Sequence, residues 1–333
     1  MLVLVTGATG FLGSHVARQL LGRGDQVRVL MRTTSDASRL DGLTVERAIG
    51  DVTDQASVLA AVHGVDAVIH CAAVVEFGAA DPTHLERVNV GGARAVLDAA
   101  VAEGIRVVHV SSLAALGPTE PGKDPKDEQW WHPGPFEVAY ERTKRAAHEH
   151  ARSLAAAGGA VRIGAPGGIY GHGDQSSMAQ LIEVFSRWSV PIGYLPDVRQ
   201  TTVNVHDCAD GLLRILDGGP ELDGAEFILG AESVAVADWL AIICRAGGHR
   251  PPLVNLPTSW VRAMGRPGAT VAGWFGQPKA MVTETVAVAT HDSAYSGQKL
   301  RDELGWEPRT LEVGMRDMVD AIRAERVSRR RAR

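Results

Sequence analysis

Tyr140 and Lys144 are the pair of side chains in this sequence that most clearly points to catalysis. They are the first and last residues of Tyr140-Glu141-Arg142-Thr143-Lys144, which lies within a stretch of helical periodicity. A spacing of four residues places both side chains on one face of a helix, one turn apart. A free phenol has a pKa of about 10, and a nearby ammonium lowers it by stabilising the phenolate. The spacing predicts a tyrosine able to exchange a proton at neutral pH; an exposed helix pair is the simpler alternative.

Ser112 is the hydroxyl side chain best placed to join this pair. It follows the apolar run Val107–Ser111, which is typical of a strand, and a residue at the carboxyl end of a parallel strand faces the ligand crevice. From there Ser112 can hydrogen-bond a substrate carbonyl and orient it for proton donation by Tyr140 while a nicotinamide delivers hydride. Capping of the following turn is the alternative role.

A glycine-rich loop near the start of the chain predicts dinucleotide binding. Glycines stand at positions 7, 10 and 13 of Thr6-Gly7-Ala8-Thr9-Gly10-Phe11-Leu12-Gly13, between a strand-like run and an amphipathic helix. Glycines allow a tight turn and a close approach of backbone to pyrophosphate, whose charge is met by unpaired N–H groups at the helix N-terminus. A plain strand-to-helix turn needs only one glycine.

The residues after the second and third strands bear on the choice of cofactor. Binding of NAD(H) ordinarily uses a carboxylate after the second strand, where this chain has Arg32. A guanidinium can bind the 2′-phosphate of NADP(H), so NADP(H) is favoured and NAD(H) stays open. Thr33, Thr34 and Ser35 can add hydroxyl donors. Asp51 is expected either to accept the adenine amino group or to cap a helix.

The elements that would position these residues alternate in the first half of the sequence. Helical stretches separate the apolar runs at 2–6, 27–31, 45–49, 67–70 and 107–111. This is the pattern of βαβ units in an α/β, doubly wound parallel Rossmann sheet. We predict a dinucleotide-binding domain at 1–165 with returning segments near 200–230, a smaller and mostly helical C-terminal substrate domain at 166–325, and a basic, solvated tail at 326–333.

Composition narrows the class of protein. The balance of 34 Lys+Arg against 39 Asp+Glu offers no electrostatic reason to expect nucleic acid as a partner. Cys71, Cys208 and Cys244 are widely spaced and suggest neither disulfides nor a metal site. The chain starts directly in a strand-like run and holds no apolar run of membrane-spanning length, so we expect a cytoplasmic protein.

In combination, the motifs resemble the extended short-chain dehydrogenase/reductase family of the NAD-dependent epimerase/dehydratase superfamily. The resemblance covers nearly the whole chain and includes these segments in order: the glycine loop, His70-Cys71-Ala72-Ala73, Val88-Asn89-Val90, Ser112, the Tyr140–Lys144 motif, Pro166-Gly167-Gly168-Ile169-Tyr170-Gly171, Val205-His206-Asp207-Cys208-Ala209 and Leu304-Gly305-Trp306.

The resemblance implies roles for single residues. Tyr140 would be the general acid–base, Lys144 would bind the nicotinamide ribose and lower the tyrosine pKa, and Ser112 would bind the reacting oxygen. The implied cofactor contacts are Gly7, Thr9, Gly10, Phe11, Leu12, Gly13, Arg32, Asp51, Val52, Ala72, Tyr140, Lys144 and Pro166. The family often has Arg-Pro where this chain has Ala165-Pro166, which leaves any role of that arginine in doubt. A homodimer through paired helices would be normal for the family.

Family members catalyse either net redox reactions or redox-neutral changes of nucleotide sugars. Dehydratases carry an acidic pair after the catalytic serine, where this chain has Leu113 and Ala114. Arg32 and aromatic residues at 130, 131, 136, 260, 274 and 275 favour a carbonyl reductase for a largely apolar small molecule. This resembles the dihydroflavonol reductase and 3β-hydroxysteroid dehydrogenase branch. A nucleotide-sugar epimerase with retained NAD and a non-catalytic cofactor sensor are the alternatives; the aromatics could also simply pack the smaller domain.

Overall fold

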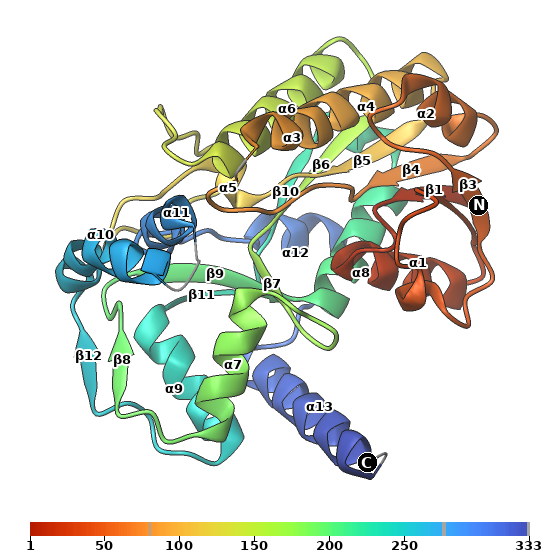
Figure 1. Cartoon of the computed structure of the whole chain (residues 1–333). Helices are drawn as coiled ribbons and strands as arrows, with labels where there is room; N and C mark the ends of the chain where they lie inside the picture. Colours follow the sequence, from red (N-terminus) through yellow and green to blue (C-terminus); the bar gives the residue numbers. More distant parts are fainter. Residues whose placement is uncertain (80, 275–277, 332–333) are drawn as a thin grey trace.

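A seven-stranded sheet in which every neighbouring pair is parallel organises the first half of the chain (Figure 1). The computed structural model describes residues 1–79, 81–274 and 278–331. The strand order is β10-β6-β5-β4-β1-β2-β3. The strands are β1 (Leu2–Thr6), β2 (Gln26–Met31), β3 (Glu46–Ile49), β4 (Ala67–His70), β5 (Arg106–Val110), β6 (Val161–Pro166) and β10 (Glu226–Leu229). The doubly wound Rossmann sheet predicted from the sequence is confirmed.

Helices cover both faces of this sheet because its strands are apolar on both sides. In β1, Val3 and Val5 pack into one core cluster and Leu4 packs into another. The first cluster includes residues of α1 (Phe11–Gly22), α8 (Val205–Asp217) and α12 (Gln298–Leu304). The second includes residues of α2 (Gln55–Val62), α4 (Ala93–Ala102) and α6 (Ala139–Ala156). This arrangement exposes the carboxyl ends of the central strands as the place for a ligand.

The second half of the chain forms smaller layers below the sheet in Figure 1. It contains β7 (Gly168–Tyr170), β9 (Arg199–Asn204) and β11 (Glu232–Ala235) in one small sheet, and β8 (Ile192–Tyr194) with β12 (Val254–Leu256) in another. Its helices are α7 (Ser177–Arg187), α9 (Val236–Gly247), α10 (Thr258–Trp274), α11 (Lys279–Ala289) and α13 (Leu311–Arg331). Between these segments α8 and β10 return to the large sheet, so the chain crosses between the two parts more than once.

The last helix extends further than the sequence suggested. Helix α13 runs to Arg331, so most of the segment that we assigned to a solvated basic tail continues the helix. No helix in the described part of the chain is both long and apolar enough to cross a membrane.

Candidate active site

The turn between β1 and α1 is built so that only glycine fits at two positions. Gly7 has a φ of +71°, and a Cβ there would lie 2.7 Å from the backbone nitrogen of Ala72. A Cβ on Gly13 would lie 2.3 Å from the carbonyl oxygen of Gly7. The loop therefore packs backbone against backbone, and helix α1 starts close behind the end of β1.

The N-terminus of α1 is open to an anion. Gly10 is its N-cap, no side chain caps its first N–H groups, and its first turn contains no acidic residue. Free N–H groups and the positive end of the helix dipole suit a pyrophosphate. The residues present thus fit a dinucleotide, which when bound supplies or accepts a hydride. Phe11 and Leu12 would hold its phosphates through backbone N–H groups, whereas the N–H of Gly10 donates to the carbonyl of Gly7 at 2.9 Å.

Substitution at Gly13 tests this packing. We expect Gly13→Ala to destabilise the fold by about 1–3 kcal/mol, because the added methyl overlaps the Gly7 carbonyl, and to weaken dinucleotide binding. Gly22→Ala is the matched control, since it lies at the end of the same helix and no atom comes within 4 Å of an added Cβ. Denaturant unfolding and a fluorescence titration with dinucleotide measure both effects. Equal stability and affinity of the two variants would refute the close approach.

Arg32, Asp51 and Val52, which were expected to contact the cofactor, follow the neighbouring strands β2 and β3. Arg32 follows β2 and is exposed, and within the described residues no hydrogen bond or ion pair engages its guanidinium. Asp51 Oδ1 accepts hydrogen bonds of 2.9 Å from the backbone N–H and the hydroxyl of Thr53. The cap of α2 is Asp54, whose carboxylate accepts from the N–H groups of residues 56 and 57. Asp51 therefore shapes a turn, and of the two roles expected for it, helix capping is wrong.

The structure brings Ser112, Tyr140 and Lys144 together at the carboxyl end of β5. Ser112 lies two residues after the end of β5 and caps the short helix α5 (Leu113–Leu116), where its Oγ accepts from the Ala114 N–H at 3.2 Å. Its hydroxyl also lies close enough to that of Tyr140 to lower the tyrosine pKa. Tyr140 and Lys144 lie one turn apart in α6, and the ammonium of Lys144 donates to the carbonyl of Val110 at 2.9 Å. Of the two roles expected for Ser112, capping of the following turn is confirmed, and binding of the reacting oxygen stays a prediction.

Burial controls the protonation of this group. Burial raises the pKa of Tyr140, and the nearby Ser112 hydroxyl acts in the opposite direction. Burial lowers the pKa of Lys144 to about 8. Lys144 is not among the causes of the tyrosine shift, so a lowering of the tyrosine pKa by this ammonium stays a prediction for the complex with cofactor and substrate.

Glu141, next to Tyr140, is a buried carboxyl group that the sequence analysis missed. Burial raises its pKa to about 7, a backbone hydrogen bond with Val138 partly offsets this shift, and the carboxylates of Glu137 and Glu284 add to it. The folded state therefore binds a proton at Glu141 more tightly than the unfolded chain, and this group lowers stability as pH rises from about 4.5 through 7.

A pH-dependent gain in stability follows for Glu141→Gln. We expect the variant to match the protein near pH 4.5 and to exceed its free energy of unfolding by up to about 3 kcal/mol near pH 8. Urea unfolding at the two pH values measures this difference. Glu303→Gln, on the exposed surface of α12, controls for a general effect of removing a carboxylate. A gain that is the same at both pH values would contradict the assigned protonation.

Asn89 and Phe77 fix the loop after β4 against α6. Asn89 donates to the carbonyl of Val74 at 2.9 Å and to the hydroxyl of Thr143 at 3.1 Å, and it accepts from the Val74 N–H. The ring of Phe77 lies edge-on to Tyr140, with centroids 5.9 Å apart. Nothing in the sequence pattern set Phe77 apart, although an aromatic residue soon after the His70-Cys71-Ala72-Ala73 motif could have suggested it.

The segment between Ser112 and Tyr140 contains Trp131, whose ring contacts two arginines of α6. Arg145 lies over the ring of Trp131 at 3.3 Å, and Arg152 lies over it at 3.8 Å. Arg145 also donates to the carbonyls of Ala115 and His132. Trp131 therefore joins this segment to α6, and its expected place in an apolar pocket wall stays a prediction. The side chain of Trp274 and the whole of Phe275 lie outside the described residues.

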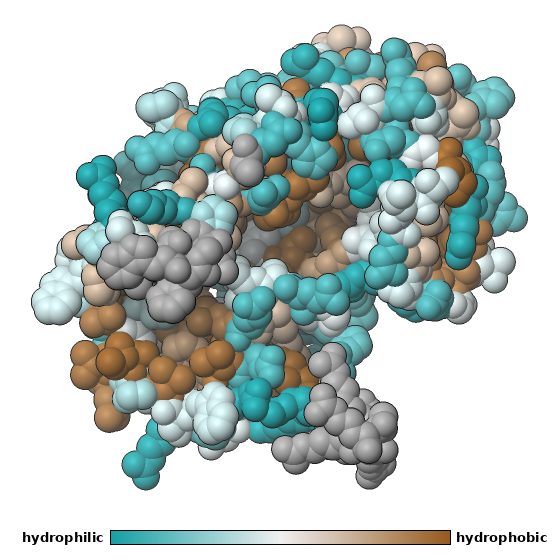
Figure 2. Space-filling view, viewed as in Figure 1, coloured by the Kyte–Doolittle hydropathy of each residue, from teal (hydrophilic) through white to brown (hydrophobic). Residues whose placement is uncertain are grey.

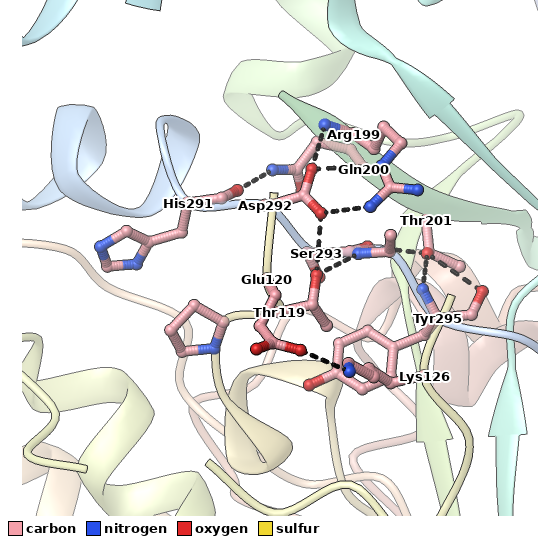
Figure 3. Close-up of polar contacts among 12 residues, drawn as sticks. Thr119, Glu120, Lys126, Arg199, Gln200, Thr201, His291, Asp292, Ser293 and Tyr295 are labelled. Carbon is pink, nitrogen blue, oxygen red and sulfur yellow. Dashed lines mark hydrogen bonds and ion pairs between the residues drawn. The ribbon is translucent and has the colours of Figure 1, made fainter. Parts of the chain in front are cut away.

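A polar network anchors the same segment to the second half of the chain (Figure 3). The carboxylate of Asp292 accepts from the Thr119 hydroxyl at 2.9 Å and from the guanidinium of Arg199 at 2.8 Å. The hydroxyl of Tyr295 donates to the carbonyl of Gly117. Asp292 is buried, so these charge-assisted bonds hold the segment between Ser112 and Tyr140 in one position relative to β9.

Comparison with known proteins agrees with this geometry. The model of the "NAD dependent epimerase/dehydratase family" matches residues 3–230. A protein named "Sterol demethylase protein B" from Methylococcus capsulatus is 36% identical over 77% of this chain and 78% of its own length. A "3 beta-hydroxysteroid dehydrogenase/Delta 5-->4-isomerase" from Mycobacterium tuberculosis is 30% identical over 92% of this chain and 86% of its own.

Other relatives extend the match to the full chain. A "Putative dihydroflavonol 4-reductase" from Synechocystis is 28% identical over 95% of this chain and 92% of its own length. The crystal structure of gox2253 superposes with a TM-score of 0.81 at 30% identity, covering 97% of this chain and 98% of that one. These relatives support an NAD(P)-dependent enzyme of oxidoreductase or epimerase type. The chain belongs to the NAD-dependent epimerase/dehydratase family and, within it, to the extended short-chain dehydrogenase/reductases.

Proposed function

We propose that this protein is an NADP(H)-dependent oxidoreductase that interconverts a ketone or aldehyde and an alcohol on a largely apolar small molecule. The observation that carries the proposal is the convergence of Ser112, Tyr140 and the buried Lys144 at the carboxyl end of β5, where the Lys144 ammonium donates to the Val110 carbonyl. In the reductive direction Ser112 holds the substrate carbonyl, and Tyr140 donates the proton to its oxygen. Lys144 contributes its charge to the site and a contact for the nicotinamide ribose.

Residues after the catalytic serine favour net redox chemistry over dehydration. Leu113 and Ala114 occupy α5, where a dehydratase needs groups that remove and deliver protons. The names of the relatives refer to a sterol, a steroid and a dihydroflavonol, which all present oxygen functions on largely apolar frameworks. This supports an apolar carbonyl compound as the substrate class.

Arg32 supports NADP(H) as the cofactor. Its guanidinium is exposed at the carboxyl end of β2. A side chain in this place can bind a 2′-phosphate, which a carboxylate would repel.

A substrate panel tests the proposal. Apolar ketones and aldehydes and a set of nucleotide sugars are offered to the purified protein with NADPH and with NADH, and oxidation of the reduced cofactor is followed together with product formation. The proposal predicts oxidation of NADPH with apolar carbonyl compounds. Conversion of a nucleotide sugar with retained NAD would establish the epimerase alternative, and tight cofactor binding without any turnover would establish the sensor.

A further inference from the structure

A group of large apolar side chains is exposed around β8, β12 and the start of α10. It consists of Ile192, Leu253, Val254, Trp260 and Met264, with exposed fractions from 48% for Met264 to 83% for Leu253. We call these five residues the tip surface. Figure 2 shows apolar residues gathered on the side of the molecule where Figure 1 places β8 and β12. We had expected Trp260 to line a pocket or to pack the core, and the structure shows neither because its side chain is 60% exposed.

Local structure holds these side chains at one end of the molecule. Ile192 and Val254 are partners in the β8–β12 pair, so their side chains lie next to each other on the same face of this small sheet. Leu253 lies beside the start of β8, because its N–H donates a 2.9 Å hydrogen bond to the carbonyl of Pro191. Trp260 and Met264 are one turn apart in α10, which begins two residues after β12. Apolar groups of this kind on a soluble protein mark a surface that binds something.

Positive charges predominate around the tip surface, although the exposed Asp197 accepts a hydrogen bond from the Thr258 hydroxyl beside it and Arg245 pairs with Glu312. No Asp or Glu occurs between residues 239 and 283, although the whole chain has a net charge of −5. The same stretch contains five exposed cations: Arg245, Arg250, Arg262, Arg266 and Lys279. An exposed tryptophan and aliphatic residues framed by cations are the composition that binds the interface of an anionic lipid bilayer. In a symmetric pair of chains, these like charges would face each other, which disfavours a second copy as the occupant.

The tip surface is connected to the catalytic residues through two helices. Gly265 of α10 lies against Val286 of α11, since a Cβ on Gly265 would be 3.1 Å from its side chain. Glu284 of α11 accepts a hydrogen bond from the N–H of Gly78. Gly78 follows Phe77, whose ring contacts Tyr140. The elements next to the catalytic tyrosine are thus held by the hairpin whose outer end carries Trp260 and Met264.

We propose that the tip surface docks this protein on anionic phospholipid bilayers, with Trp260 and Leu253 inserted at the interface and the arginines on the lipid phosphates. The benefit of docking rests on the proposed function, because an apolar substrate concentrates in the bilayer. Docking itself needs no turnover. It adds a peripheral membrane contact to a fold that has no spanning helix among its described residues.

Flotation with lipid vesicles tests the proposal on the full chain. The vesicles contain phosphatidylcholine alone or phosphatidylcholine with phosphatidylglycerol, at low and high salt. We expect binding to the vesicles with phosphatidylglycerol and at least about fivefold weaker binding to the neutral ones. We expect Leu253→Ser with Trp260→Ser to weaken binding by at least about tenfold, and Arg250→Glu with Arg266→Glu to weaken it by a similar factor that high salt removes.

Control variants separate docking from general effects. Leu59→Ser in α2 removes an apolar side chain that is 44% exposed, and Arg94→Glu in α4 reverses an exposed charge; both should float like the unmodified protein. Thermal unfolding verifies that each variant is folded. Absence of flotation, equal flotation of tip and control variants, or a change from dimer to monomer in sedimentation as the only effect of Leu253→Ser with Trp260→Ser would each overturn the proposal. A protein that floats but reduces no ketone would refute the proposed function and leave docking intact.

Discussion

Replacement of Tyr140 by phenylalanine is expected to lower turnover of an apolar ketone by about 10²–10⁴-fold, the usual contribution of a positioned acid–base group. The variant removes the tyrosine hydroxyl and keeps the ring that contacts Phe77. The site should therefore stay folded, and dinucleotide affinity should be nearly unchanged. Steady-state kinetics together with a dinucleotide titration measure the two effects separately.

Tyr194→Phe is the matched control for this substitution. Tyr194 lies in β8 and is also half-buried, which raises its pKa to about 12, but it is remote in sequence and sheet from the catalytic group. Loss of the Tyr194 hydroxyl should leave kcat equal to that of the unmodified protein within the error of the assay. Retention of activity in Tyr140→Phe would refute the acid–base role, and an equal loss in both variants would indicate a structural effect instead.

Replacement of Arg32 by alanine is expected to weaken binding of NADPH by about 10–100-fold, the range for lost hydrogen bonds to a charged group. Binding of NADH should change little, because it has no 2′-phosphate for the guanidinium to hold. The structure offers a direct comparison in Arg47, an exposed arginine of β3 on the neighbouring strand. Arg47→Ala should leave both affinities unchanged.

The cofactor titration also has a clear contrary result. If NADH binds more tightly than NADPH to the unmodified protein, or if Arg32→Ala weakens both cofactors equally, Arg32 is not a phosphate ligand. Substitution by aspartate would then be expected to favour neither cofactor, whereas the present account predicts that Arg32→Asp inverts the preference towards NADH.

The central strands could be predicted well from sequence because their signal is local. The runs that form β1 and β4 are buried on both faces, so almost every residue in them is apolar, and their observed bounds equal the expected ones. The spacing of Tyr140 and Lys144 predicted that both side chains share one face of a helix, because this signal is also local. The partner of β10 is a different matter: its pairing with β6 depends on contact between segments about 60 residues apart, which no local pattern specifies.

Side-chain environment was the part that sequence could not supply. Trp131 and Trp260 are the same residue type, yet one lies between two guanidinium groups and the other is exposed to solvent. Asp292 became informative only when the fold brought it to Thr119, 173 positions away. Glu141 follows Tyr140 in the sequence, but its raised pKa results from burial that depends on the packing of the whole region.

Transfer of a labelled hydride tests the central claim most directly. NADPH that carries deuterium at the transferable position of its nicotinamide is supplied with an apolar ketone, and the alcohol product is analysed by mass spectrometry. The account predicts one deuterium on the carbinol carbon of each product molecule, with one NADP⁺ formed per alcohol. A product free of deuterium, or turnover of substrate while the labelled cofactor stays unchanged, would contradict net carbonyl reduction.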